Sequence, residues 1–136
     1  VMVGDGQMKQ EVDAHTRHHP RIRTTPFLQD PSALAEWYQA ADLLLHPGRW
    51  ETFGLVLLEA QACGLPVIAF RGGAMDEQSL DVADWATERN SDAFAAAVQR
   101  KMLRLRETDP GPLSAYINQN FSWDKTFARQ MAEYES

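Results

Sequence analysis

The sequence predicts an α/β fold with an open, parallel, Rossmann-like sheet and flanking helices. Short apolar runs alternate with amphipathic segments, at intervals that suit strand-helix-strand units joined by right-handed crossovers. The run at residues 42–46 is continuous rather than alternating, which is typical of a parallel strand covered on both faces. Loops with glycine and acidic residues follow several of these runs, at the sheet edge where such folds bind ligands.

In the first half of the chain, proline and aspartate mark the ends of the predicted helices. Pro20 ends the first helix, because proline cannot continue it. Asp30 can cap the second helix, and Pro31 suits its first position. The elements expected here are a strand at 1–3, a helix at 7–18, a strand at 22–27, a helix from residue 31 with Leu34, Trp37 and Tyr38 on its inner face, and a strand at 42–46.

In the second half, glycine, proline and serine give the same kind of signal. Gly64 caps the helix before it, and Pro66 introduces the next strand. Ser122 caps the last helix. The elements expected here are a helix at 53–63, a strand at 66–70, a short edge strand at 84–86, a helix at 91–108, a short helix after a break at 109–112, and a last helix from residue 122.

Composition excludes several classes of function. The net charge is −6, which speaks against nucleic acid or an anionic membrane as the main partner. No apolar stretch reaches the roughly 18 residues that a membrane span needs, and a single cysteine, Cys63, fits a reducing compartment, so a cytoplasmic location is expected. The basic residues near the end of one helix are expected to interact with its dipole; they are Arg100, Lys101, Arg104 and Arg106.

Residues 46–64, HPGRWETFGLVLLEAQACG, contain two glutamates with seven residues between them. Glu51 precedes the predicted helix, and Glu59 lies roughly 9 Å along its axis, at about 1.5 Å per residue, which is similar to the length of a diphosphate. Carboxylates accept hydrogen bonds from sugar hydroxyls. The free N–H groups of a helix amino terminus bind anions, and Gly54 removes a side chain where the backbone must come close.

This segment resembles the donor-binding motif of retaining glycosyltransferases of the GT-B architecture, family four, also called glycosyl transferases group one. The resemblance continues through VGDG, PFL, ADLLLHP, ACGLPVIA, the Gly72-Gly73 pair and FSWDKTFARQMAEY. It implies that residues 1–121 are a nucleotide-sugar-binding, C-terminal domain that lacks its first strand and helix. It also implies that residues 122–136 form a helix that packs back toward an N-terminal domain in the full enzyme.

The resemblance also implies a role for each part of the motif. Glu51 and the backbone after it would position the donor sugar, the first N–H groups of the helix would bind the phosphates, and Glu59 would bind the ribose. A loop from another strand would frame the base through main-chain groups. The nucleotide-binding residues implied besides Glu51 are Thr52, Phe53, Gly54, Leu55, Val56, Glu59, Phe27, Leu28 and Gly4.

The implied reaction moves a hexose from a nucleoside-diphosphate sugar to an acceptor hydroxyl, with retention at the anomeric carbon and without a metal or other cofactor. The acceptor, whether glycan, lipid or small molecule, stays open, and any peripheral membrane contact is expected through the missing N-terminal domain. The chain alone is expected to be inactive. A nucleotide-sugar epimerase of the same fold and a non-catalytic nucleotide-binding module remain alternatives.

The Gly4-Asp5-Gly6 turn and the segment after Gly72-Gly73 each allow a second interpretation. A haloacid dehalogenase phosphatase also has a strand followed by Gly-Asp-Gly, but it needs an Asp-X-Asp motif, and this sequence contains none. After Gly72-Gly73 the resembling family commonly has Pro-Glu, whereas this chain has Ala-Met-Asp-Glu. Whether Asp76 or Glu77 takes that place is left open by the sequence.

Overall fold

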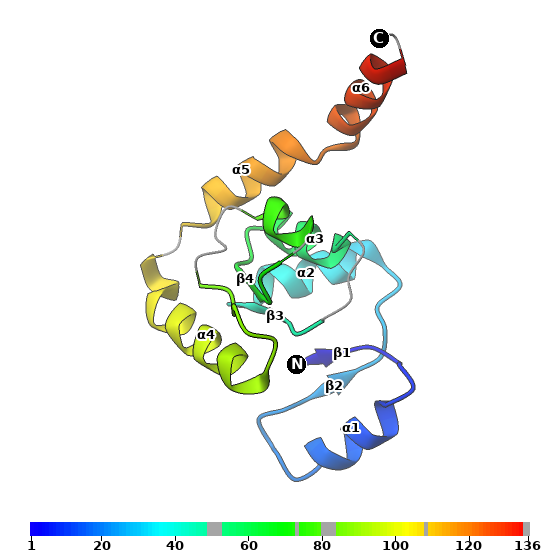
Figure 1. Cartoon of the computed structure of the whole chain (residues 1–136). Coiled ribbons are helices and arrows are strands. Elements are labelled where there is room, and N and C mark those ends of the chain that lie inside the picture. The colour runs from blue at the N-terminus through cyan, green and yellow to red at the C-terminus, as the bar shows by residue number, and fades with distance from the viewer. Residues whose placement is uncertain (49–52, 73, 80–83, 108, 135–136) are drawn as a thin grey trace. The chain divides into compact units, whose positions relative to one another are not determined.

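A computed structural model describes residues 1–48, 53–72, 74–79, 84–107 and 109–134 of the chain (Figure 1). Its contacts divide the chain into two compact units, Val1–Glu36 and Trp37–Ser136. Each unit is described by itself. Helix α2 (Pro31–Ala40) spans the boundary between them.

Unit 1 is a small strand-helix-strand unit. It contains β1 (Met2–Val3), α1 (Lys9–Thr16) and β2 (Thr24–Thr25), and the two strands pair in parallel with Met2 opposite Thr24. Asp13 ties α1 to β2, because its Oδ1 accepts a 2.8 Å hydrogen bond from the Thr24 hydroxyl. That bond, together with one from Lys9, lowers the pKa of the Asp13 carboxyl from its usual value.

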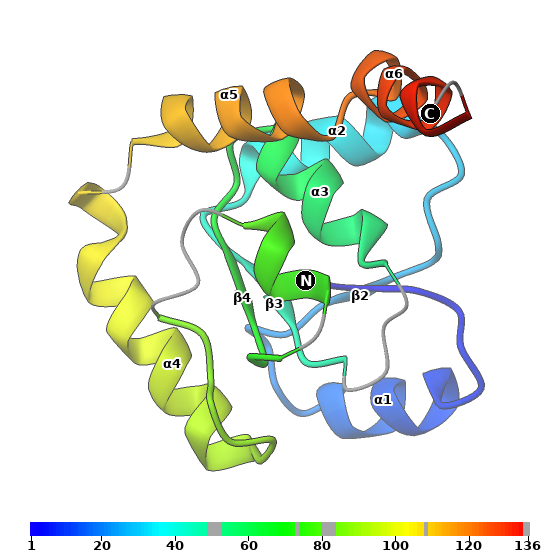
Figure 2. The same ribbon diagram turned by 45° about the horizontal axis from the view of Figure 1, so that its top comes forward.

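Unit 2 contains a parallel strand pair with helices on both sides. Strand β3 pairs with β4 so that Leu44, Leu45 and His46 lie opposite Val67, Ile68 and Ala69. In Figures 1 and 2, α3 and α4 lie on opposite sides of this pair, and α5 lies against α3. The elements are β3 (Leu44–His46), α3 (Leu55–Ala62), β4 (Val67–Ala69), η1 (Ala74–Gln78), α4 (Ser91–Arg104), η2 (Leu105–Glu107), α5 (Pro110–Asn120) and α6 (Trp123–Tyr134).

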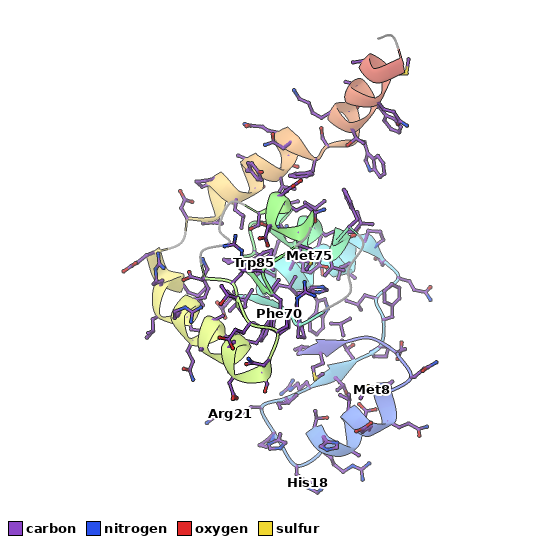
Figure 3. The ribbon with its side chains drawn as sticks, viewed as in Figure 1. Met8, His18, Arg21, Phe70, Met75 and Trp85 are labelled. Carbon is purple, nitrogen blue, oxygen red and sulfur yellow. The ribbon has the colours of Figure 1, made fainter. Side chains whose placement is uncertain are left out.

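The core of unit 2 forms around β4. Ile68 and Leu57 are 0% exposed and Trp85 is 1% exposed, and each such side chain contributes about 1.5–3 kcal/mol by leaving water. Trp85 also donates its indole N–H to the Val67 carbonyl oxygen at 2.8 Å, so its polar atom is satisfied. Figure 3 shows Phe70, Met75 and Trp85 gathered in this interior.

The predicted α/β fold class is confirmed, and the differences lie in element boundaries. The strands are shorter than expected, and the edge strand at 84–86 is a single parallel bridge between Phe70 and Ala86. The predicted break between two helices is present but lies earlier than 109–112, because α4 ends at Arg104 and α5 begins at Pro110. Asp109 caps that helix by accepting the Gly111 N–H at 2.9 Å, and Pro110 occupies its first turn.

Two burial predictions are also wrong. Trp37 is 40% exposed, because it is rotated by about 100° around the helix axis from the buried Tyr38. Leu45 is 48% exposed, although the continuous apolar run predicted a strand covered on both faces. Neighbouring strand residues point to opposite faces, and the side of β3 that carries Leu45 is covered less completely than the side that carries Leu44.

Asp84 anchors α4 to the strand layer. Its side chain is 6% exposed and accepts hydrogen bonds from Arg104 Nη1 at 3.1 and 3.5 Å, while Lys101 Nζ lies 4.0 Å from Oδ2. Arg100 donates to the Asp84 carbonyl oxygen at 3.3 Å. Three of the four basic residues assigned to the helix dipole therefore converge on one buried aspartate, which the dipole interpretation missed.

We expect Asp84→Ala to lower the free energy of unfolding by about 3 kcal/mol, because it leaves the buried Lys101 ammonium without this carboxylate. Urea unfolding of the 136-residue chain measures the change. Asp92→Ala is the control: Asp92 is an exposed acid in the first turn of α4, where its loss costs about 0.5 kcal/mol. Equal losses in the two variants would contradict the anchoring role of Asp84.

Candidate functional site

The amino-terminal end of α3 has two N–H groups without an acceptor among the described residues. The helix has eight residues and follows Gly54, whose φ is 69°, and its first turn carries no acidic residue. Leu57 and Leu58 bond the Gly54 carbonyl oxygen at 2.9 and 3.3 Å, whereas the N–H groups of Leu55 and Val56 have no acceptor within the described part of the chain. Leu55 is 58% exposed and Val56 is 41% exposed. N–H groups without an internal acceptor at the positive end of a helix dipole are the groups that bind anions.

Gly54 is required at this position for two reasons. Its positive φ is rarely adopted by residues with a side chain. In addition, a Cβ on Gly54 would lie 3.1 Å from Gln78 Oε1 and 3.4 Å from Met75 Cγ. The segment η1 therefore packs directly against the turn that opens α3.

Gln61 holds η1 in place from inside the core. It is 0% exposed, and its Nε2 donates to the Leu57 carbonyl oxygen at 2.9 Å and to the Gln78 carbonyl oxygen at 3.0 Å. Tyr116 of α5 adds a hydrogen bond to the Glu77 carbonyl oxygen at 3.2 Å. The position of η1, and through it the helix opening, thus depends on two other helices.

Asp76 closes the turn that precedes η1. Its Oδ1 accepts the Gly72 N–H and its Oδ2 accepts Arg71 Nε, both at 2.9 Å. The side chain of Glu77, by contrast, is exposed. Asp76 is therefore held beside Gly72 by two hydrogen bonds, whereas Glu77 faces solvent.

Glu59 projects from α3 and pairs with a tyrosine of α2. The Tyr38 hydroxyl donates to Glu59 Oε2 at 3.2 Å, and Tyr38 is 8% exposed while Glu59 is exposed. Burial, followed by the charge of Glu59, raises the pKa of the Tyr38 hydroxyl well above that of free tyrosine. The sequence indicated Tyr38 as an inner-face residue, but its partner is 21 positions away in the chain and gave no local signal.

The predicted base-framing residues lie in unit 1. Phe27 is 66% exposed and Leu28 is half-buried, directly after β2. The Phe27 N–H donates to Asp5 Oδ2 at 2.7 Å, and the Gly4 N–H donates to the Thr25 carbonyl oxygen at 3.0 Å. Asp5, which sequence reasoning treated as part of a turn, therefore fixes the backbone at Phe27.

The structure brings part of the predicted site together. Phe53, Gly54, Leu55, Val56 and Glu59 follow one another at the start of α3, all within unit 2. The remaining predicted residues have other outcomes: Gly4, Phe27 and Leu28 belong to unit 1, and Glu51 and Thr52 lie outside the described residues.

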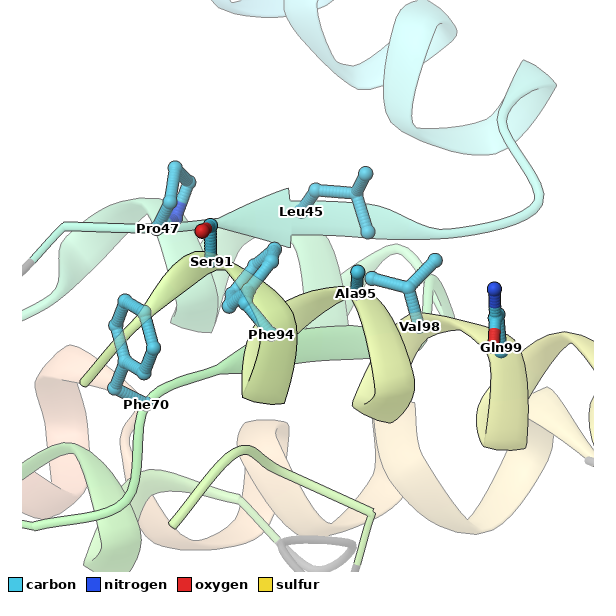
Figure 4. A pocket seen from close by; sticks show the side chains of 8 residues that line it. All are labelled: Leu45, Pro47, Phe70, Ser91, Phe94, Ala95, Val98 and Gln99. Atoms are coloured by element: carbon cyan, nitrogen blue, oxygen red, sulfur yellow. The ribbon is translucent and has the colours of Figure 1, made fainter. Parts of the chain in front are cut away.

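A cavity of about 560 Å³ lies elsewhere in unit 2, between β3 and α4 (Figure 4). Leu45 and Pro47 face Phe94, Ala95 and Val98 across it. A large apolar cavity is the usual first candidate for a ligand site. A diphosphate needs several hydrogen-bond donors, however, so the open end of α3 is the better candidate for a polar ligand.

The described residues offer neither a metal cluster nor a membrane-spanning helix. They contain no group of three or more His, Cys, Asp or Glu side chains arranged to hold a metal ion. Within the same residues, every helix is too short or too polar to cross a bilayer.

A parallel α/β fold with an open helix end and a nearby carboxylate is typical of proteins that bind phosphate-containing ligands. The chain belongs to the glycosyl transferases group 1 family, whose model matches residues 1–103. The predicted resemblance to this family is therefore confirmed.

Several curated relatives are D-inositol 3-phosphate glycosyltransferases. The protein from Arthrobacter sp. is 34% identical over 131 residues, which are 92% of this chain and 29% of that protein. The protein from Geodermatophilus obscurus is 41% identical over 105 residues, 74% of this chain and 22% of that protein. The chain thus spans about a quarter of the length of these relatives.

Solved structures of glycosyltransferases with the GT-B architecture share the fold. Sucrose-phosphate synthase from Thermosynechococcus elongatus is 25% identical with a TM-score of 0.76, over 95% of this chain and 33% of that one. Anabaena HepE in complex with UDP-glucose is 25% identical with a TM-score of 0.68, over 97% of this chain and 39% of that one. Short parallel sheets with flanking helices therefore correspond to part of a GT-B fold.

We expect Gly54→Ala to lower the free energy of unfolding by about 1–2 kcal/mol, because a Cβ is strained at this φ and meets Gln78 and Met75. Urea unfolding measures the effect. Gly6→Ala is the control, since a Cβ on Gly6 meets no atom within 4 Å, and its effect should stay within about 0.5 kcal/mol. A Gly54→Ala variant as stable as Gly6→Ala would contradict the described turn.

Proposed function

We propose that this chain is the donor-binding part of a retaining glycosyltransferase that moves a hexose from a nucleoside-diphosphate sugar to an acceptor hydroxyl. The observation that carries the proposal is the amino-terminal end of α3, where the Leu55 and Val56 N–H groups have no acceptor among the described residues and Glu59 lies on the same helix. These groups would bind a diphosphate and a ribose hydroxyl, respectively.

The resemblance to the family supplies the other residues of the proposed donor site. Glu51 and the backbone of Thr52 to Gly54 position the donor sugar. The main chain at Phe27 and Leu28 frames the base, and the hydrogen bond that the Phe27 N–H donates to Asp5 Oδ2 supports an ordered backbone there. Gly4 ends the neighbouring strand in the same unit.

The comparisons support a sugar nucleotide as the donor. HepE, at 25% identity, was solved in complex with UDP-glucose, and the curated relatives are glycosyltransferases by name. The same names give D-inositol 3-phosphate as the acceptor of those relatives. We therefore take UDP-glucose as the first donor to test.

The proposed reaction uses electrostatic stabilisation without a metal or other cofactor. As the bond from the anomeric carbon to the diphosphate oxygen breaks, negative charge grows on the diphosphate. The N–H groups at the start of α3 are fixed in place to stabilise this charge. Glu51 orients the sugar, and the leaving phosphate helps to take the proton from the acceptor hydroxyl on the same face, which retains the anomeric configuration.

Helix α6 supports the proposed boundary at residue 122. It exposes three large apolar side chains at a spacing of four residues: Trp123 at 74%, Phe127 at 57% and Met131 at 58%. The rings of Trp123 and Phe127 stack at 5.8 Å. Since the chain spans about a quarter of its relatives, we propose that residues 122–136 pack against an N-terminal domain of the longer protein.

Donor binding by this chain tests the proposal. UDP-glucose should bind, with millimolar affinity, of order −4 kcal/mol. Glu59→Ala should weaken binding about tenfold by removing a charged acceptor. Saturation-transfer NMR and calorimetry measure both, with GDP-glucose and ADP-glucose alongside.

Glu107→Ala is the matched control, because Glu107 is an exposed glutamate of η2. It should leave the affinity for UDP-glucose unchanged, and EDTA should also leave it unchanged if no metal takes part. No binding of any sugar nucleotide would contradict the proposed function, and an unchanged affinity in Glu59→Ala would remove the role of Glu59.

Catalysis is tested in the longer protein that contains this chain. There, Glu51→Ala should lower kcat about 100-fold, with a smaller change in the donor KM, because it removes orientation and charge stabilisation of the reacting sugar. Steady-state kinetics measure the rate, and NMR of the product reports the anomeric configuration. A full rate in the Glu51→Ala enzyme, or an inverted product, would contradict the mechanism.

A further inference from the structure

The hydrogen bond between Tyr38 and Glu59 joins two neighbouring helices of the fold. Tyr38 lies near the end of α2, and its ring is almost entirely buried, at 8% exposure. Its hydroxyl donates to Glu59 Oε2 at 3.2 Å. The bond is partly buried, because Tyr38 is buried and Glu59 is exposed. Both residues belong to unit 2.

This bond restricts the carboxylate that the proposed function assigns to the ribose. A glutamate on an exposed helix surface samples many rotamers, and fixing it on a ligand costs conformational entropy. The rigid, buried phenol removes part of that freedom before any ligand arrives. Oε2 is occupied by Tyr38, and Oε1 has no hydrogen-bond partner among the described residues, so it can accept a bond from a hydroxyl.

Tyr38 remains a hydrogen-bond donor over the whole physiological pH range. Burial is the main cause that raises the pKa of its hydroxyl, and the negative charge of Glu59 adds to it. Cys63, one turn further along α3, contributes in the same direction. A carboxylate held by a permanent donor on one oxygen presents the other oxygen in a constant geometry.

We propose that Tyr38 is a positioning residue that orients Glu59 toward the ribose hydroxyls, so that the pair selects ribonucleotide donors over deoxyribonucleotide donors. The proposal rests on the proposed function, because it assumes that Glu59 faces the ribose. Loss of the phenol hydroxyl should weaken the binding of a ribonucleotide and leave a nucleotide without ribose hydroxyls unaffected.

The test compares Tyr38→Phe with Thr126→Val in the full chain. Thr126 of α6 is the control, because its hydroxyl also makes a hydrogen bond, to the Ser122 carbonyl oxygen at 3.1 Å, and it lies outside the candidate site. The probes are UDP and 2′,3′-dideoxy-UDP, and calorimetry gives their affinities. Tyr38→Phe should weaken the binding of UDP about fivefold and leave that of dideoxy-UDP unchanged, whereas Thr126→Val should change neither affinity.

Equal losses for both nucleotides, or no loss, would overturn the positioning role while leaving the proposed function intact. A wild-type chain that binds neither UDP nor dideoxy-UDP would instead contradict the proposed function itself.

Discussion

The turn at Gly54 is the constraint on which the candidate site depends. Gly54 has a left-handed conformation and precedes α3. Because Gly54 has no side chain, Gln78 and Met75 of η1 can pack closely against the turn, where a Cβ would contact them. Leu55 and Val56 are exposed, and their N–H groups have no acceptor among the described residues. A residue with a side chain would strain the turn and displace η1. The left-handed conformation of Gly54 therefore determines both the start of α3, where the proposed anion would bind, and the packing of η1.

Hydrogen bonds from α3 and from α5 hold η1 against this turn. Gln61 links α3 to η1 by two hydrogen bonds from inside the core, and Tyr116 links α5 to the same segment. Ser114 of α5 donates to the Ala62 carbonyl oxygen at 2.7 Å, which holds the other end of α3. Helix α3 is thus hydrogen-bonded to η1 and to α5, and binding groups on rigid elements lose little entropy when a ligand arrives.

Local signals in the sequence predicted the fold class and the order of the helices and strands, because caps and periodicity depend on neighbouring residues. Gly64, for example, has the positive φ expected of a helix cap, and Asp30 accepts the Ser32 N–H as predicted. These local signals could not predict hydrogen bonds between residues that are far apart in the sequence. The bonds from Asp5 to Phe27 and from Tyr38 to Glu59 join positions 22 and 21 apart, and the exposure of Leu45 depends on how completely other segments cover its face.

The charge of the chain limits what this part of the site can do alone. The net charge is −6, Arg71 is ion-paired with Asp76, and Glu59 adds a carboxylate close to the proposed diphosphate. Within the described start of α3, attraction for the proposed diphosphate comes from the backbone dipoles, which contribute about half a unit of positive charge at the helix end. That partial charge can orient a dianion but cannot neutralise it. Neutralising the proposed diphosphate would therefore need cationic side chains in addition to the helix end, and donor affinity should rise when such side chains approach it.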